Sequence, residues 1–387
     1  KIQRGGKVIQ RIATTKLAKK TCRTTVQLPE GLHSFTLTVT SGSKTKRQSM
    51  VANISHYLMV VMGDSYASGE GNPRNVDAWL NNRSPSFDPY WDDDQCNRSV
   101  HGAPAQAALQ LERSSKKTSV TLVDVSCSGA TMQKGILGPQ LRGMKSQIEA
   151  VNDLVKGRDI DAIVMSAGGN DVGFGSILTS CALQSNCPLA TTTTPPLSAY
   201  PTMQTGVQAL TAELPTGYSL INKCFTDSTC TGTQNQNLPG LSLSPIGQVF
   251  LNSYPDPTRS ETGSTCSYLT ISQEDFAWAH DTILDPSPVD PFMYRTTQGR
   301  VVPLSSGAGS LNGAIANTTQ IGWKPIMGTW SKTGTGSTGH GVCAGGQSWI
   351  FGLTGIFGFT SGSFHPNPVG QKKISGIIFR EMVASGF

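Results

Sequence analysis

Three glycine-containing stretches carry residue types that acyl transfer requires. The stretch 63–66 (GDSY) supplies a hydroxyl, 126–130 (SCSGA) supplies backbone N–H groups that glycine leaves accessible, and 168–171 (GGND) adds a carboxamide. A serine hydroxyl becomes a strong nucleophile only when a neighbouring imidazole accepts its proton. The stretches therefore predict nucleophilic catalysis by a serine, provided that a histidine reaches it.

Six histidines compete for the role of the base. His365 lies in the proline-rich stretch SGSFHPNPVG, directly before the last predicted helix, where a loop can carry it over the edge of a sheet. His340, in GHGVC, is the alternative. For the other four a structural role is the simpler interpretation (His33, His56, His101 and His280). We predict that His365 is the general base.

The elements that must position these residues alternate between strands and helices from Tyr57 onward. Apolar runs at 57–62, 119–126, 161–171 and 246–255 predict strands, and the segments at 103–114, 139–157, 202–214, near 303–317 and 368–384 predict helices. Such alternation is typical of a doubly wound α/β domain, in which ligands bind at the carboxyl ends of parallel strands. Each of the three stretches lies at the carboxyl end of one of these apolar runs, so we expect them to meet at one edge of the sheet.

Four blocks of the sequence also resemble a known family. GDSYASGEG, CSGA, GGNDVGF and FHPN, in this order, resemble the four blocks of SGNH hydrolases, also called GDSL esterases, particularly the secreted actinobacterial-type lipases and esterases. The resemblance implies a flavodoxin-like three-layer α/β/α fold with a parallel central sheet. It implies that Ser65 is the nucleophile, that His365 is the base, and that the N–H groups of Ser65 and Gly129 and the side-chain amide of Asn170 form the oxyanion hole.

One position departs from the family pattern. The family usually places an aspartate three residues before the histidine, where this chain has Gly362. We hypothesise that the backbone carbonyl of Gly362 accepts a hydrogen bond from Nδ1–H of His365 in place of the triad acid. A more distant acid, Asp285 or Asp290, is the alternative. A carbonyl dipole can hold the tautomer, but it lacks the full charge that stabilises an imidazolium.

The nine cysteines indicate an oxidising compartment, because the chain has no CxxC or HExxH pattern typical of zinc sites. We therefore expect a secreted or extracytoplasmic protein. Spacing alone does not fix connectivity. Our hypothesis pairs Cys96–Cys127, Cys181–Cys187, Cys224–Cys230 and Cys266–Cys343, with Cys22 left over.

Composition divides the chain into two parts. Residues 1–50 hold 11 of the 31 Lys and Arg residues and a single acidic residue, Glu30, and residues 24–54 alternate like β-strands around a Ser-Gly-Ser turn. We predict a small basic β module at 1–55, interpreted as an Ig-like remnant. An SGNH hydrolase domain follows at 56–387, with a disulfide-bearing insertion at about 176–245. The basic segment fits contact with an anionic surface, although a solvated basic face is the simpler interpretation.

These features predict an esterase or lipase that hydrolyses carboxylic esters through an acyl-serine, with lipid or phospholipid acyl esters favoured. The chemistry needs no metal or organic cofactor. A glycan O-acetyl esterase is one alternative, and a non-catalytic carbohydrate-surface binding protein that retains the scaffold is another. We expect a small-molecule or lipid ester as substrate, no nucleic-acid partner, because the basic segment lacks aromatic stacking residues, and a monomer.

Overall fold

The computed structural model describes residues 2–4, 7–10, 26–81, 89–140, 143–232, 236–241, 246–285, 293–295, 301–303, 309–330, 336–353 and 362–387. The chain forms two compact units. Unit 1 comprises Lys1–Tyr57 and Leu111–Thr121, and unit 2 comprises Leu58–Gln110 and Leu122–Phe387.

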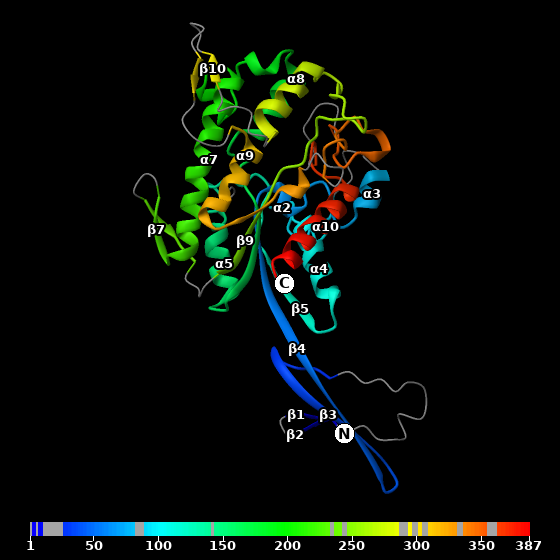
Figure 1. Cartoon of the computed structure of the whole chain (residues 1–387). Helices are drawn as coiled ribbons and strands as arrows, with labels where there is room; N and C mark the ends of the chain where they lie inside the picture. The colour runs from blue at the N-terminus through cyan, green and yellow to red at the C-terminus, as the bar shows by residue number, and fades with distance from the viewer. Residues whose placement is uncertain are drawn as a thin grey trace. The chain divides into compact units, whose positions relative to one another are not determined.

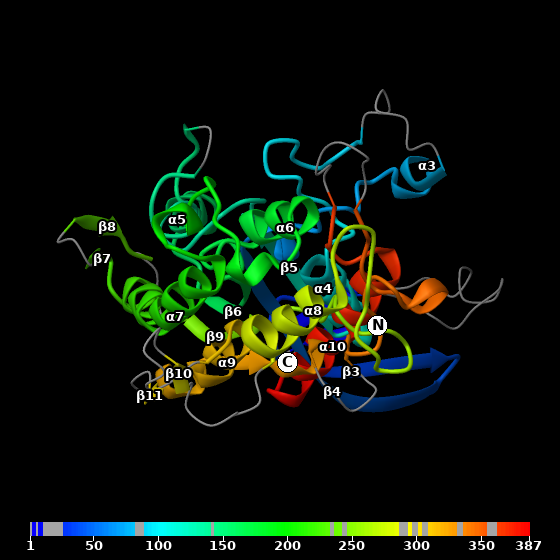
Figure 2. The ribbon, with the colours of Figure 1, turned by 90° about the horizontal axis from the view of Figure 1, so that it is seen from above.

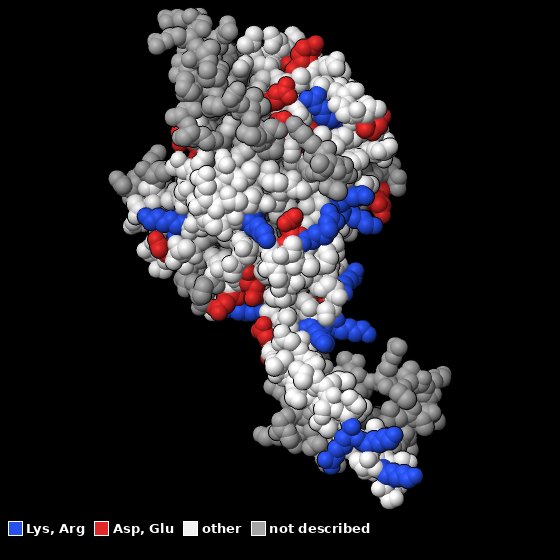
Figure 3. All heavy atoms as spheres, viewed as in Figure 1, with Lys and Arg blue, Asp and Glu red and all other residues white. Residues whose placement is uncertain are grey.

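Unit 1 is built on an antiparallel β-hairpin. Strand β3 (Gly31–Ser41) pairs with β4 (Lys44–Gly63) from Ser41↔Lys44 to Gly31↔Ile54, and the short strands β1 (Ile2–Arg4) and β2 (Lys7–Gln10) extend the pairing beyond β3. The chain turns at Gly42, which has φ +57°, as the Ser-Gly-Ser pattern predicted. Basic side chains gather on this hairpin (Figure 3), where Lys44, Lys46 and Arg47 are exposed.

Strand β4 runs without a break to Gly63, whereas the sequence predicted that the β pattern of residues 24–54 ends before a separate strand at 57–62. Residues 54–57 (ISHY) contain no glycine or proline that would end a strand, so β structure continues through them. The boundary between the units falls after Tyr57, inside this strand and two residues from the predicted boundary at 55/56. The Ig-like interpretation of this module stays a prediction.

Unit 2 is an α/β domain with a mostly parallel sheet, which confirms the predicted fold class. Its strand order is β5 (Thr118–Asp124), the end of β4, β6 (Ile160–Ser166), β9 (Ile246–Asn252) and β12 (Lys324–Ile326), and the pairs β4–β6, β6–β9 and β9–β12 are parallel. Residues 59–62 and 162–165 are fully buried, as expected for strands covered on both faces. Helices lie on both sides of the sheet, with α4 (Ala103–Ser114) and α10 (Pro368–Ala384) on one side and α5 (Gln147–Val155) and α7 (Met203–Thr226) on the other (Figures 1 and 2).

The remaining described elements are short. They comprise the helices α2 (Ser65–Ser68), α3 (Val76–Asn81), α6 (Phe174–Leu183), α8 (Gln273–Trp278) and α9 (Leu311–Ala316), and the strands β7 (Thr229–Thr231), β8 (Asn237–Pro239), β10 (Met293–Arg295) and β11 (Val301–Pro303). A π-helix spans Ala279–Leu284, and single 3-10 turns occur at Cys187–Leu189, Leu197–Ala199, Asn317–Ile321, Met327–Thr329 and Gly345–Gln347. No helix in the described part of the chain has the length and hydropathy needed to cross a bilayer.

Three predicted helices have different bounds in the structure. The helix expected near 303–317 is α9 (Leu311–Ala316), and Val301–Pro303 form strand β11. Helix α5 begins at Gln147 rather than at Pro139, because Ser146 and Glu149 form a reciprocal capping box at its N-terminus. Helix α7 continues through Pro215 to Thr226 rather than ending at residue 214. Its apolar face continues to Tyr218 and further residues that pack into the core, and this burial outweighs the proline.

The segment predicted as an insertion, 176–245, is the crossover connection between the parallel strands β6 and β9. Helix α7 lies within it, and the buried side chains of this segment belong to the main hydrophobic core, among them Met203, Val207 and Ile221. The segment is therefore part of the domain's core and not a decoration of one face. Two cysteine pairs, Cys181–Cys187 and Cys224–Cys230, lie in it at disulfide-bonding distance.

Candidate active site

Ser65 begins helix α2 directly after strand β4 leaves the sheet. Gly63 has φ +113°, and a Cβ atom at this position would lie 1.9 Å from the carbonyl oxygen of Ser166 on the neighbouring strand. Only glycine fits there, so the sharp exit depends on it. Asp64 caps the helix by accepting a hydrogen bond from the N–H of Tyr66 at 3.0 Å. Ser65 is thereby held at the carboxyl end of the first strand.

His365 lies against Ser65, as the sequence predicted. Its Nε2 atom is 2.6 Å from Ser65 Oγ, and both side chains are buried. This distance is typical of a hydrogen bond between a nucleophile and its general base. The alternative base, His340, stacks on the ring of Trp349 at 4.4 Å, and its Nδ1 atom lies 2.8 Å from the carbonyl oxygen of Gln347. That environment is structural.

The carbonyl next to Nδ1 of His365 belongs to Ser363, at 2.8 Å, and not to Gly362 as hypothesised. The carbonyl of Gly362 instead accepts the backbone N–H of His365 at 3.0 Å and closes a turn. Because this turn uses the Gly362 carbonyl, the imidazole is oriented by the carbonyl one residue later. In the described part of the chain, no carboxylate lies at Nδ1. Asp285 is instead 3.8 Å from His280 Nε2, and Asp290 lies outside the described residues.

Two hydrogen bonds connect the loop of the nucleophile to the loop of the histidine. The hydroxyl of Tyr66 donates to the carbonyl of Phe364 at 2.8 Å, and the amide of Asn72 donates to the carbonyl of Pro366 at 2.7 Å. The ring of Tyr66 also packs against the imidazole, with centroids 4.7 Å apart. The residues before and after His365 are therefore both bound to the loop of the nucleophile, and this fixes the contact between Ser65 and His365.

Ser65, Gly129 and Asn170 line one cleft of about 750 Å³ together with His365. Gly129 has φ +80°, and the backbone N–H groups of Ser65 and Gly129 donate no hydrogen bond to any described residue. The Nδ2 group of Asn170 donates to the carbonyl of Ala130 at 2.9 Å, which occupies one of its two hydrogens. Three N–H donors thus remain for an oxyanion in the cleft.

The loop of Gly129 is held at the edge of the sheet by a disulfide. Cys127 pairs with Cys96, and its N–H donates to the carbonyl of Gly63 at 3.0 Å. The fourth cysteine pair, Cys266–Cys343, also lies at bonding distance, so the structure contains the four pairings of the sequence hypothesis.

Asp64 braces the ends of several strands. Its carboxylate accepts hydrogen bonds from the hydroxyl of Ser166, at 2.6 Å, and from the hydroxyl of Tyr254, which in turn accepts the N–H of Gly169 at 2.9 Å. Burial raises the pKa of Asp64 above its usual range, and these hydrogen bonds oppose the shift. Burial likewise raises the pKa of Asp171 to about 7. Neither carboxylate takes part in the Ser65–His365 pair.

Glu70 is a site residue that the sequence reasoning missed. It is buried, its Oε2 atom accepts the hydroxyl of Ser128, and the same atom lies 3.9 Å from His365 Nε2. Its Oε1 atom accepts the N–H of Gly362 at 3.3 Å. The one signal in the sequence was a charged residue in the small, glycine-rich block GDSYASGEG.

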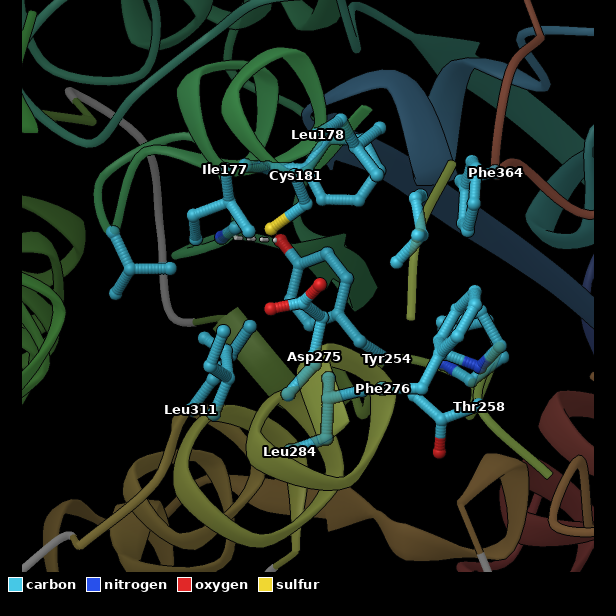
Figure 4. A pocket seen from close by; sticks show the side chains of 18 of the residues that line it. Ile177, Leu178, Cys181, Tyr254, Thr258, Asp275, Phe276, Leu284, Leu311 and Phe364 are labelled. Atoms are coloured by element: carbon cyan, nitrogen blue, oxygen red, sulfur yellow. Dashed lines mark hydrogen bonds between the residues drawn. The ribbon is translucent and has the colours of Figure 1, made fainter. Parts of the chain in front are cut away.

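An apolar pocket of about 80 Å³ lies next to the cleft (Figure 4). Phe174 and Leu178 border both spaces, and the ring of Phe174 lies edge-on to the imidazole of His365 with centroids 5.6 Å apart. The labelled walls of the pocket are mostly apolar side chains, among them Ile177, Phe276, Leu284, Leu311 and Phe364. Across the described residues, no cluster of three or more His, Cys, Asp or Glu side chains could hold a metal ion.

Comparison with solved structures finds similar proteins at low identity. Phospholipase A1 from Streptomyces albidoflavus NA297 is 19% identical with a TM-score of 0.45, and the match covers 85% of this chain and 98% of that one. An extracellular lipase from Streptomyces rimosus is 18% identical with a TM-score of 0.45, and the match covers 84% and 99% of the two chains. Est24, a carbohydrate acetylesterase from Sinorhizobium meliloti, is 10% identical with a TM-score of 0.33, covering 85% and 99%.

No protein-family model and no curated protein matches the chain. The three similar structures are named as a phospholipase, a lipase and a carbohydrate acetylesterase. Their activities are not carried over at this identity, so the function has to be inferred from the chain's own site.

Proposed function

We propose that the chain is a serine esterase that hydrolyses carboxylic esters through an acyl-serine. Ser65 Oγ attacks the ester carbonyl while His365 Nε2 accepts its proton, and the same imidazole then protonates the departing alkoxide. Water, activated by His365, attacks the acyl-enzyme and releases the acid. The N–H groups of Ser65 and Gly129 and the amide of Asn170 stabilise the oxyanion in both steps.

The observation that carries this proposal is the 2.6 Å contact between Ser65 Oγ and His365 Nε2 in a cleft that also holds three N–H donors. The carbonyl of Ser363 supports it further, because an acceptor at Nδ1 leaves Nε2 free of its proton and able to act as a base. At Nδ1 this carbonyl takes the place of a third side chain.

We propose acyl esters of lipids as the favoured substrates. The apolar pocket next to the cleft offers an acyl chain an environment that excludes water, and its border at Phe174 and Leu178 lies beside the catalytic imidazole. Burying each methylene of the chain contributes about 0.8 kcal/mol. An acetyl group would gain almost nothing from this pocket, so turnover should rise with acyl length.

Glycan O-acetyl ester hydrolysis is the second candidate. The cleft itself is wide and lined by several polar side chains, among them Thr131, Lys134, Thr179 and Thr194, which fits a sugar better than a lipid tail. A series of chromogenic esters from acetyl to long-chain acyl separates the two. A preference for long acyl groups supports the lipid proposal, and a preference for acetyl groups overturns it.

Covalent labelling tests the proposal of an enzyme against that of a binding protein. A fluorophosphonate should modify the folded chain at Ser65, and Ser65→Ala should abolish both labelling and ester hydrolysis. His365→Ala should suppress labelling as well, because the hydroxyl would lose its base. A folded wild-type sample that neither labels nor hydrolyses any ester would instead support a carbohydrate-surface binding protein.

We further propose an extracytoplasmic location, supported by the four cysteine pairs at bonding distance.

The exposed Lys44, Lys46 and Arg47 of the β3–β4 hairpin support contact of the N-terminal segment with an anionic surface. Binding to anionic vesicles should then weaken with rising salt and with substitution of these three residues by glutamine.

A further inference from the structure

Glu70 places a buried carboxylate beside the base. Its Oε2 atom lies 3.9 Å from His365 Nε2, the ring nitrogen that receives the proton of Ser65. Both of its oxygens accept hydrogen bonds, one from the hydroxyl of Ser128 and one from the N–H of Gly362. Both oxygens of a carboxylate are acceptors, so the two hydrogen bonds fix the position of the group beside the imidazole.

The other side of the imidazole lacks such a charge. Nδ1 faces the neutral carbonyl of Ser363, which fixes the ring but offers only a dipole when the ring becomes positive. A buried imidazolium without a counter-charge is costly, because little water reaches it. A carboxylate within about 4–6 Å offsets that cost.

The other titratable groups around His365 are poorer candidates for this role. Asp64 precedes the nucleophile. Its carboxylate already accepts hydrogen bonds from Ser166, Tyr254 and the N–H of Tyr66, and burial raises its pKa. Asp171 lines the cleft, and burial raises its pKa to about 7. In the described part of the chain, Glu70 is the carboxylate within ion-pairing distance of His365.

We propose that Glu70 is a positioning residue that supplies the negative charge missing from the triad, stabilising the imidazolium of His365 from its Nε2 side. The charge acts when Ser65 transfers its proton to Nε2 and again when water does so during deacylation. No bond to Glu70 forms or breaks, and the proton goes on from His365 to the leaving group. This inference rests on the proposed ester hydrolysis.

The hydrogen bonds of Glu70 also give it a structural role, because they connect the loops of Ser65, Gly129 and His365. Glu70→Gln separates the two roles. A glutamine has the same shape, its oxygen can accept the N–H of Gly362, and its amide can donate to the hydroxyl of Ser128, so the connection is kept while the charge is lost.

The experiment is the pH profile of kcat/KM for the full chain with a chromogenic ester that the wild type hydrolyses. For Glu70→Gln we expect kcat/KM to fall by about ten- to hundredfold, and we expect the acid limb of the profile to move by about one unit to lower pH. Glu70→Asp should restore part of both. Ser128→Ala, which removes a hydrogen bond and leaves the charge, should leave the acid limb in place.

Glu261→Gln is the matched control, because it makes the same neutralisation at an exposed carboxylate. Urea denaturation checks that each variant is folded. If kcat/KM of Glu70→Gln falls at every pH while the acid limb stays where it is in the wild type, the role of Glu70 is only structural and the inference is overturned. A folded Glu70→Asp variant that behaves like Glu70→Gln also overturns it. An inactive wild type would instead contradict the proposed function, so the two failures are distinguishable.

Discussion

Asn170→Ala removes one donor from the oxyanion hole, and the structure sets the size of the expected effect. The amide of Asn170 has two hydrogens, of which one is used by the carbonyl of Ala130 at 2.9 Å and the other remains for the substrate. Loss of the second should lower kcat by about 10²- to 10³-fold, or about 2.7–4 kcal/mol of transition-state stabilisation. Loss of the first should lower the free energy of unfolding by about 1 kcal/mol.

Steady-state kinetics with a chromogenic ester and urea denaturation measure the two effects separately. KM should change little, because the donor acts mainly on the oxyanion and not on the bound ester. Asn170→Asp is the control for shape, since it keeps the size of the side chain but has no N–H donor, and it should lose at least as much activity. A variant with unchanged kcat, or one whose loss lies entirely in KM, would show that Asn170 is not an oxyanion donor.

Three further predictions follow from neighbouring contacts. Phe174→Ala widens the passage between the cleft and the apolar pocket, so the acyl-length preference in an ester series should shift further towards long chains, and an unchanged series would contradict the acyl-pocket proposal. Tyr254→Phe removes a buried hydrogen bond to Asp64 and should lower the free energy of unfolding in urea by about 2–3 kcal/mol, whereas an unaltered urea midpoint would argue against this brace. Burial raises the pKa of Asp171 from 3.8 to about 7, so the folded protein binds this proton more tightly than the unfolded chain does. The free energy of unfolding therefore falls as pH rises through about 7, by at most about 4 kcal/mol. Asp171→Asn should flatten this loss between about pH 4 and about pH 7 in urea titrations, and equal slopes in both proteins would refute the assignment.

The positions of Ser65 and His365 could be predicted because local features determine them. An apolar run that ends in Gly63 marks the end of a strand, and a histidine before a proline-led helix marks a loop near the same edge. Helices α4 and α10 have the predicted bounds for the same reason, since the helical composition of α4 and the Asn367 cap of α10 are local features. The missed start of α5 was also local, because the capping box at Ser146 was present in the sequence.

The acceptor at Nδ1 and the role of Glu70 could not be read from the sequence. Whether Gly362 or Ser363 faces the imidazole depends on the backbone torsions of one turn, and both residues offer the same carbonyl group. Glu70 is a charged residue in a loop, and such residues are mostly exposed. Its burial follows from contacts with Ser128 and Gly362, and the latter is 292 positions away.

The hydrogen bonds from Tyr66 and Asn72 to the carbonyls of residues 364 and 366 affect when the site can assemble during synthesis. The nucleophile and its base are 300 positions apart. Tyr66 and Asn72 hold the imidazole beside Ser65 by binding residues 364 and 366, so they can do so only when that part of the chain is present. A nascent chain that has not yet reached residue 366 carries the serine without the base. Esterase activity should therefore begin only after residues 364–366 have been synthesised and have folded against the loop of Ser65.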